Sequence, residues 1–234
     1  MKTTILYFNK LALSGVLAFS MFACGEDDVA PQQTAQVNMS FNTVNTSSAS
    51  AGERVLAGNS LAFTSGFITI REIQFEAESA TDSVEVDLEQ ITVIDFATGI
   101  STPDISGLTI PAGTYNEVEV EIELQDDSDE PAVVLNGTYT DANGVKHPVR
   151  FEFNSGETFE VEKEGAITFA GGESILAQVT FDPNVWFIEV TDEDLSLAAK
   201  DAQGVIVISE TQNTDIYESA AEGLDLATEV EISE

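Results

Sequence analysis

The chain has 234 residues, of which 42 are acidic and only eight are lysine or arginine, so its formal net charge at pH 7 is −34. So large a negative charge argues against binding to nucleic acid and against docking onto anionic lipid headgroups, because both surfaces would repel the chain. With one histidine and one cysteine, the chain also lacks the side chains from which zinc and copper sites are usually built.

The first 23 residues have the pattern of a removable export signal. Lys2 and Lys10 supply the positive end, and the stretch from Leu11 to Ala23 is almost wholly apolar. A helix of that length would reach about 20 Å, which is too short for a hydrocarbon core of about 30 Å. We therefore predict a signal peptide over residues 1–23.

The cysteine lies where such a signal would be cut. Met21-Phe22-Ala23-Cys24 resembles a lipobox, in which a signal peptidase cleaves before a cysteine that carries acyl chains. Cys24 is the only cysteine, so it has no disulfide partner within the chain. We predict that Cys24 is lipidated and that the chain meets the membrane through this anchor.

Residues 24–50 have the composition of a flexible tether. Gly25-Glu26-Asp27-Asp28 is followed by a stretch rich in Gln, Thr, Ser, Asn and Ala. The acidic run resembles the surface-export signal of Bacteroidetes lipoproteins, which implies a lipid-anchored protein on the exterior of the outer membrane. The periplasmic face of that membrane remains the alternative.

Residues 51–234 are predicted to form one β-sandwich domain. Glu117–Leu124 alternates acids with aliphatic residues, which in a strand places four carboxylates on one face and four apolar side chains on the other. Thr69–Glu76, Ser83–Leu88 and Val149–Phe153 alternate in the same way. One-sided alternation is typical of antiparallel sheets with a solvated face.

Turn residues separate these strands at short intervals. Asp141-Ala142-Asn143-Gly144 predicts a hairpin between Leu135–Thr140 and Val145–Phe153, because Asn-Gly tolerates positive φ. With similar signals elsewhere we expect about ten strands in an all-β, antiparallel sandwich.

Helix is expected only near the C-terminus. Thr191 and the acids after it predict a short helix that ends near Lys200. A second helix is expected from about Thr214 to Glu222, stopped by Gly223. Gly204–Ser209 is apolar without alternation, so we expect a central strand there.

The loop after Leu124 is the best candidate for a metal site. Its carboxylates Asp126, Asp127, Asp129 and Glu130 could surround one Ca²⁺, which prefers oxygen ligands. The loop lacks the EF-hand order of ligands. A charged, solvated loop is the alternative, and no other cofactor is predicted.

Candidate catalytic groups are few. His147 is the single histidine, and no G-x-S-x-G motif accompanies it, so a serine triad has little support. A glycosidase needs only two carboxylates, and the chain has many. Trp186 has apolar neighbours and is predicted to lie in the core rather than in a sugar platform, whereas Tyr115 and Tyr139 could have either role.

The mature chain resembles a group of Bacteroidetes surface lipoproteins whose sandwich domains have no settled function. The resemblance lies in the anchor Cys24–Asp28, the strand Phe67–Phe75, the segment Leu108–Tyr115 and the pair Trp186-Phe187. It implies an immunoglobulin- or transthyretin-like sandwich and carries over no catalytic residue.

These observations favour a non-enzymatic cell-surface lipoprotein that acts as a binding or accessory module, with a glycan or a protein as its partner. A fimbrial or adhesin-like subunit, with the stretch from Ser209 as a donor segment, is one alternative. A carboxylate-based glycoside hydrolase is the other. Under each hypothesis the crowded acids predict that stability rises with salt.

Overall fold

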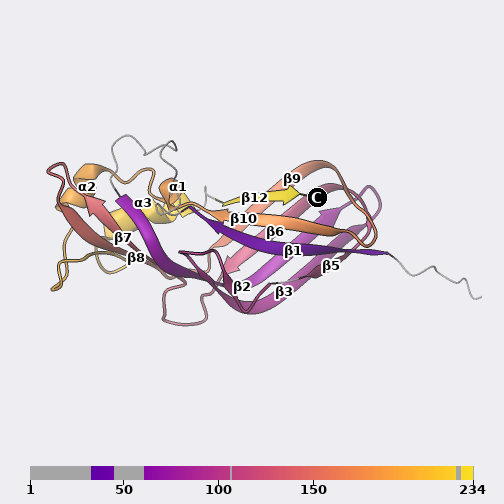
Figure 1. Cartoon of the computed structure of the whole chain (residues 1–234), viewed down its shortest axis with the longest axis horizontal. Coiled ribbons are helices and arrows are strands. Elements are labelled where there is room, and N and C mark those ends of the chain that lie inside the picture. The colour runs from indigo at the N-terminus through magenta and orange to yellow at the C-terminus, as the bar shows by residue number, and fades with distance from the viewer. Residues whose placement is uncertain (1–32, 45–60, 106, 225–227, 234) are drawn as a thin grey trace, which may run out of the picture. The chain divides into compact units, whose positions relative to one another are not determined.

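A computed structural model describes residues 33–44, 61–105, 107–224 and 228–233 (Figure 1). The predicted signal peptide, Cys24 and the acidic run after it lie outside these ranges. Within them the fold is all-β and sandwich-like, as predicted. The strands are β1 (Thr34–Thr43), β2 (Leu61–Glu78), β3 (Ser83–Asp95), β4 (Ser101–Thr102), β5 (Leu108–Pro111), β6 (Gly113–Leu124), β7 (Val133–Thr140), β8 (Lys146–Phe153), β9 (Thr158–Phe169), β10 (Ser174–Phe181), β11 (Ile206–Ile208) and β12 (Thr228–Ser233).

Two sheets contain these strands. One has the order β12-β10-β1-β5, and the other has the order β11-β8-β7-β2-β3-β4. The long strand β2 pairs with β7 over Leu61–Ile68 and with β6 over Ile70–Glu78, and β6 in turn pairs with β9. The second sheet therefore forks at β2, and only its β3-β2-β6-β9 branch faces the first sheet (Figure 1).

The alternating strands bury their apolar face, as the sequence predicts. The four aliphatic residues of β6, which are Val118, Val120, Ile122 and Leu124, are at most 1% exposed. Across the core, the ring of Phe181 on β10 lies 5.7 Å from that of Phe159 on β9. A single hydrophobic core thus joins the two sheets.

Three short helices cover the other branch of the second sheet, formed by β7, β8 and β11 (Figure 1). They are α1 (Pro183–Trp186), α2 (Asp192–Leu197) and α3 (Thr214–Leu224), where the sequence predicts one or two. The ring of Phe187, just after α1, lies 5.1 Å from the rings of both Phe63 and Phe151. None of the helices in the described ranges is long and apolar enough to cross a bilayer.

The start of α2 follows a local capping rule, whereas the end of α3 depends on packing against α1. Thr191 caps α2, as predicted, and forms a capping box with Asp194. The helix ends at Leu197, before the predicted Lys200. The prediction that Gly223 stops α3 is wrong, because the helix continues through it to Leu224. A Cβ at Gly223 would lie 2.2 Å from the carbonyl oxygen of Trp186, so glycine is needed there for the close approach of α1.

The sandwich begins earlier than the sequence analysis places it. Residues 34–43, assigned there to the tether, form β1 in the interior of the first sheet. Its inward side chains Ala35, Val37, Met39 and Phe41 are at most 8% exposed. Small polar residues between them resemble linker composition, which hides an alternation of period two.

Strand pairing also differs from the prediction in two respects. The sheets are mixed rather than purely antiparallel, because β1 runs parallel to β10 and β11 runs parallel to β8. The strand expected to be central, β11, lies at the edge of its sheet. Its apolar residues Ile206 and Ile208 are nevertheless fully buried, and α3 packs beside this strand.

Candidate functional site

The outward side of β2, β3, β6 and β9 is covered with carboxylates. Neighbouring strands place acids directly opposite one another, as in the pairs Glu76 with Glu85, Glu76 with Glu119 and Glu121 with Glu160. Gln74, Ser83 and Thr158 are the neutral members of this surface. We call it the acidic face, and its acids are Glu72, Glu76, Glu78, Glu85, Asp87, Glu89, Glu117, Glu119, Glu121, Glu123, Glu160 and Glu164.

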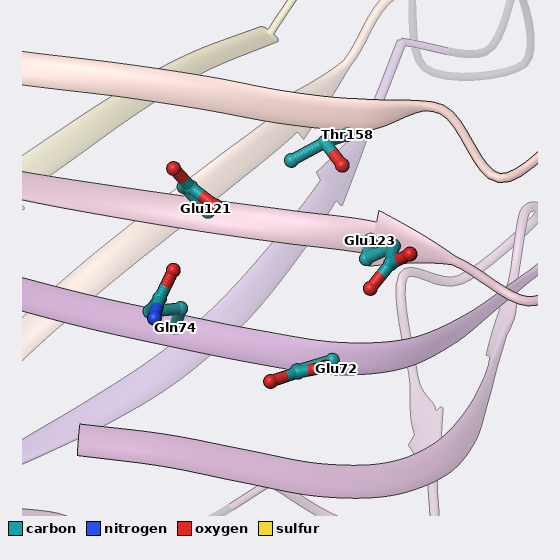
Figure 2. A pocket seen from close by; sticks show the side chains of 5 residues that line it. All are labelled: Glu72, Gln74, Glu121, Glu123 and Thr158. Carbon is teal, nitrogen blue, oxygen red and sulfur yellow. The ribbon is translucent and has the colours of Figure 1, made fainter.

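The acidic face contains a shallow hollow of about 110 Å³. Figure 2 shows its lining, with Glu72 and Gln74 on β2, Glu121 and Glu123 on the adjacent β6, and Thr158 on the strand beyond. These side chains rise from three neighbouring strands and offer mainly oxygen acceptors. A ligand in the hollow would therefore have to be a hydrogen-bond donor or a cation.

Three carboxylates form a cluster beside this hollow. One oxygen each of Glu119, Glu121 and Glu160 lie within 4.8 Å of one another. Partial burial, a side-chain hydrogen bond with Glu160 and the negative charges around it raise the pKa of Glu119 to about 7. The carboxyl group of Glu119 therefore titrates near neutral pH, first because it is partly desolvated and then because other acids surround it.

The pKa of a second carboxyl group on the acidic face, that of Glu76, is also raised. Desolvation, followed by the negative charges of Glu85 and Glu121, raises the pKa of Glu76. Gln74 relieves part of the crowding, because its amide donates to Glu85 at 3.0 Å and to Asp87 at 3.1 Å. A bound cation would relieve it further, by the attraction that lowers the pKa of a carboxyl group.

The three clustered glutamates are the described residues best placed to hold a metal ion. Ca²⁺ takes six to eight oxygen ligands, so water or bidentate carboxylates would have to complete its shell. All three side chains lie on an open sheet face rather than in a closed loop. This arrangement suits exchangeable cations or the cationic groups of a larger partner.

The loop predicted to bind Ca²⁺ is arranged around an arginine. Arg71 occupies a β-bulge in β2 and donates to Glu123 at 2.7 Å and to Asp126 at 3.1 Å. The carboxylate of Asp127 lies 3.6 Å from the same guanidinium, while Asp129 and Glu130 are exposed further along the loop. Asp126 and Asp127 therefore already have a positive charge beside them, the guanidinium of Arg71. Ca²⁺ binding by the loop stays a prediction.

Both ring nitrogens of His147 have a polar partner. Its Nε2 lies 3.1 Å from a carboxylate oxygen of Asp141, and its Nδ1 lies 2.9 Å from the ammonium of Lys200. Because an ammonium can only donate, His147 accepts at Nδ1 and donates from Nε2. The backbone N–H of Val145, and then His147, hold the pKa of Asp141 below its usual range. This group joins the β7–β8 hairpin to the segment before β11.

The aromatic residues considered as sugar platforms lie in the core. Trp186 is fully buried, as predicted, and Tyr115 and Tyr139 are only 4% and 2% exposed. The hydroxyl of Tyr115 donates to the carbonyl of Pro111, and that of Tyr139 donates to the carbonyl of Asp192. All three side chains are therefore structural, with no surface to offer a sugar ring.

Sequence reasoning predicts the alternation of three strands of the acidic face, β2, β3 and β6, but not their assembly with β9. The alternation of Glu117–Leu124 places the β6 carboxylates correctly on one side. The triad Glu119, Glu121 and Glu160 was missed, because it depends on the pairing of β6 with β9. The signal available in the sequence was that Thr158–Glu164 also has acids at every second position.

Comparisons with known proteins leave the function to be argued from these residues. No protein-family model matches the chain, and searches of curated proteins and of solved structures find no match to it either.

Proposed function

We propose that this protein is a non-enzymatic cell-surface lipoprotein, held in the outer membrane by acyl chains on Cys24, whose sandwich domain binds cationic ligands. The single observation that carries the proposal is the acidic face, in which four adjacent strands present carboxylates on one side. The anchor follows from the sequence around Cys24.

The energetics of the face support a binding role. Like charges directly opposite one another destabilise a sheet, by up to about 1 kcal/mol for a pair. Desolvation is the first cause of the raised pKa values of Glu76 and Glu119, and repulsion by the neighbouring carboxylates adds to it. A cationic ligand would replace repulsion by attraction at several positions at once, so the face is arranged to gain free energy from binding.

A binding module is favoured over a glycoside hydrolase by the surroundings of the acids. The hollow on the acidic face is lined by Glu72, Gln74, Glu121, Glu123 and Thr158, with no aromatic side chain among them. Sugar sites usually pair their acids with exposed aromatic rings, and Trp186 is buried. The fimbrial alternative gains no specific support, because β12 pairs with β10 of its own chain.

The binding role is tested by calorimetric titration of the detergent-solubilised full chain with a lysine octapeptide in 50 mM salt. We expect binding that weakens at least tenfold in the variant E76Q/E85Q/E119Q and is lost in 500 mM salt. The matched control D129N/E130Q/E193Q removes the same number of carboxyl groups from exposed positions outside the face and should change the affinity less than twofold. Equal weakening in both variants would reduce the effect to net charge and overturn the proposal.

The anchor is tested separately in cells. Labelled palmitate should enter the native chain and not the Cys24→Ser variant, which would be released from the membrane fraction. Protease added to intact cells should remove the domain if it faces the exterior. Protection of the domain would place it on the periplasmic side instead.

A further inference from the structure

Apolar side chains are exposed at one end of the acidic face. They are Phe67 on β2, Ile91 and Val93 on β3, and Ile100 just before β4. Their exposed fractions are 36%, 58%, 40% and 65%. We call these four residues the apolar strip.

The apolar strip continues the acidic face on the same side of the sheet. Along β3, the outward residues at every second position read Glu85, Asp87, Glu89, Ile91 and Val93. The row therefore changes from acidic to apolar within one strand. Beside it, Val93 pairs with Thr69, and Phe67 pairs with Asp95, whose N–H donates to the carbonyl of Ile100 at 2.9 Å.

The two surfaces meet at a second hollow, of about 370 Å³, beside the β-bulge of Arg71. Its lining includes the carboxylates of Glu72 and Glu89 and the side chain of Ile91. Arg71 is already bonded to Glu123 and Asp126, whereas neither Glu72 nor Glu89 has an ion-pair partner among the described residues. Arg71 and Asp127 also line the hollow and lie 3.6 Å apart as an ion pair, so Ile91 and the two acids without a described ion pair are what it offers to an incoming cationic group.

We propose that the acidic face and the apolar strip together bind an extended, amphipathic cationic polypeptide. Its lysine or arginine side chains would lie over Glu85–Glu89 and the acids beside them, and its apolar side chains would pack on Ile91 and Val93. The distance along β3 from Glu85 to Val93 is about 26 Å at roughly 3.3 Å per residue, so about eight extended residues cover it. This inference rests on the proposed function and names its ligand.

Charge and apolar surface together select this occupant over others. Metal ions and polyamines would satisfy the carboxylates but would leave Ile91 and Val93 exposed. An anionic lipid surface, or the acidic face of a second copy, would be repelled. A cationic stem with an aliphatic portion, such as a lysine side chain, also fits the second hollow, because its methylenes can pack on Ile91 while its ammonium reaches Glu72 or Glu89.

Two synthetic peptides of equal charge test the inference on the detergent-solubilised full chain in 50 mM salt. One joins four lysines to Leu-Thr-Leu-Thr, and the other joins four lysines to Ser-Thr-Ser-Thr. We expect the leucine peptide to bind about tenfold more tightly to the native chain, a ratio that corresponds to burial of a few apolar groups. The variant I91T/V93T should lose this ratio while its affinity for the serine peptide stays within twofold.

The matched control is Leu176→Thr, which removes a 40% exposed apolar side chain from the outer side of β10, on the other sheet. It should keep the tenfold ratio. Threonine favours strands, so both variants should melt within a few degrees of the native chain, which a thermal melt checks. Equal affinity of the native chain for the two peptides, or a ratio unchanged in I91T/V93T, would overturn the inference and leave the proposed function standing. Failure of both peptides to bind would overturn the proposed function itself.

Discussion

The two outer sides of the sandwich are built on the same inward pattern and differ in what they present to solvent. Opposite the acidic face, the outward side chains of β1, β5 and β10 are mostly uncharged, and they include Gln36, Asn38, Asn42, Thr109, Ser174, Gln178 and Thr180. We call this the neutral face. Its residues bond across strands, for example Gln36 to Thr109 at 2.7 Å and Asn38 to Ser174 at 2.6 Å.

This contrast separates what the fold requires from what the acids add. Both faces keep their strands by alternation, with polar residues outward and apolar residues in a shared core. Neutral amides and hydroxyls are sufficient on β1, β5 and β10, so carboxylates are not needed to form a strand pair. Because like charges opposite one another are destabilising, the acids of β2, β3, β6 and β9 point to a role beyond folding.

The largest losses in the free energy of unfolding should come from substitutions in the shared core. They should be similar under the acidic face and under the neutral face. Phe75 lies under the acidic face and Phe181 under the neutral one, and they are 1% and 0% exposed. We expect Phe75→Ala and Phe181→Ala each to lower the free energy of unfolding by about 3–5 kcal/mol. Urea unfolding measures both values. A loss below about 1 kcal/mol in only one variant would mean that its sheet packs independently of the other.

The sequence predicted the buried pattern of the core strands because alternation is a local property. Val118 and Ile122 were placed correctly from period two alone. The strand β1 was missed, since its apolar residues are separated by residues typical of linkers. The edge position of β11 and the parallel pairing of β1 with β10 depend on long-range topology, which no local pattern in this chain encodes.

For the candidate site, too, the sequence predicted what depends on one strand and missed contacts between distant segments. The alternation in β6 placed Glu119 and Glu121 on one side, but the partner Glu160 comes from a strand almost forty residues later. The acidic loop was singled out because its acids are adjacent in sequence. Arg71, a bulge residue more than fifty positions earlier in the chain, pairs with the loop acids Asp126 and Asp127. The sequence of the loop does not predict this contact.

An effect of intermediate size is expected from pH, because the acidic face contains a carboxyl group, that of Glu119, whose pKa changes on folding. The pKa of Glu119 rises from about 4.5 to about 7 on folding, so in this window the folded chain binds a proton that the unfolded chain has released. The free energy of unfolding should therefore fall as pH rises from 4.5 to 7, by about 1 kcal/mol after allowance for solvent screening. Glu119→Gln should remove this fall and melt about 2–4 °C higher than the native chain at pH 8.

The control for this pH series is Glu130→Gln, which removes one exposed carboxylate from the β6–β7 loop. Its melting temperature should follow that of the native chain at every pH between 5 and 8. If the native chain and Glu119→Gln gave parallel curves instead, desolvation and the neighbouring carboxylates would not raise the pKa of Glu119 on folding.

The smallest effect should be on the salt dependence of melting, when acids are removed from the acidic face or added to the neutral face. The pair Glu76 and Glu85 faces each other across β2 and β3, whereas Gln36 and Ser174 are neighbours across β1 and β10. Melting of the native chain should rise between 10 and 500 mM NaCl, because a shorter Debye length weakens repulsion between exposed carboxylates. E76Q/E85Q should reduce that gain by a few tenths of a kcal/mol, because it removes the like-charged pairs of Glu76 with Glu85 and with Glu119. Q36E/S174E should increase the gain by a few tenths of a kcal/mol, because it adds one like-charged pair. A native chain that melts at the same temperature throughout the salt series would mean that bound cations already compensate the acidic face, and the melts repeated in EDTA, Mg²⁺ and Ca²⁺ at matched ionic strength would identify which.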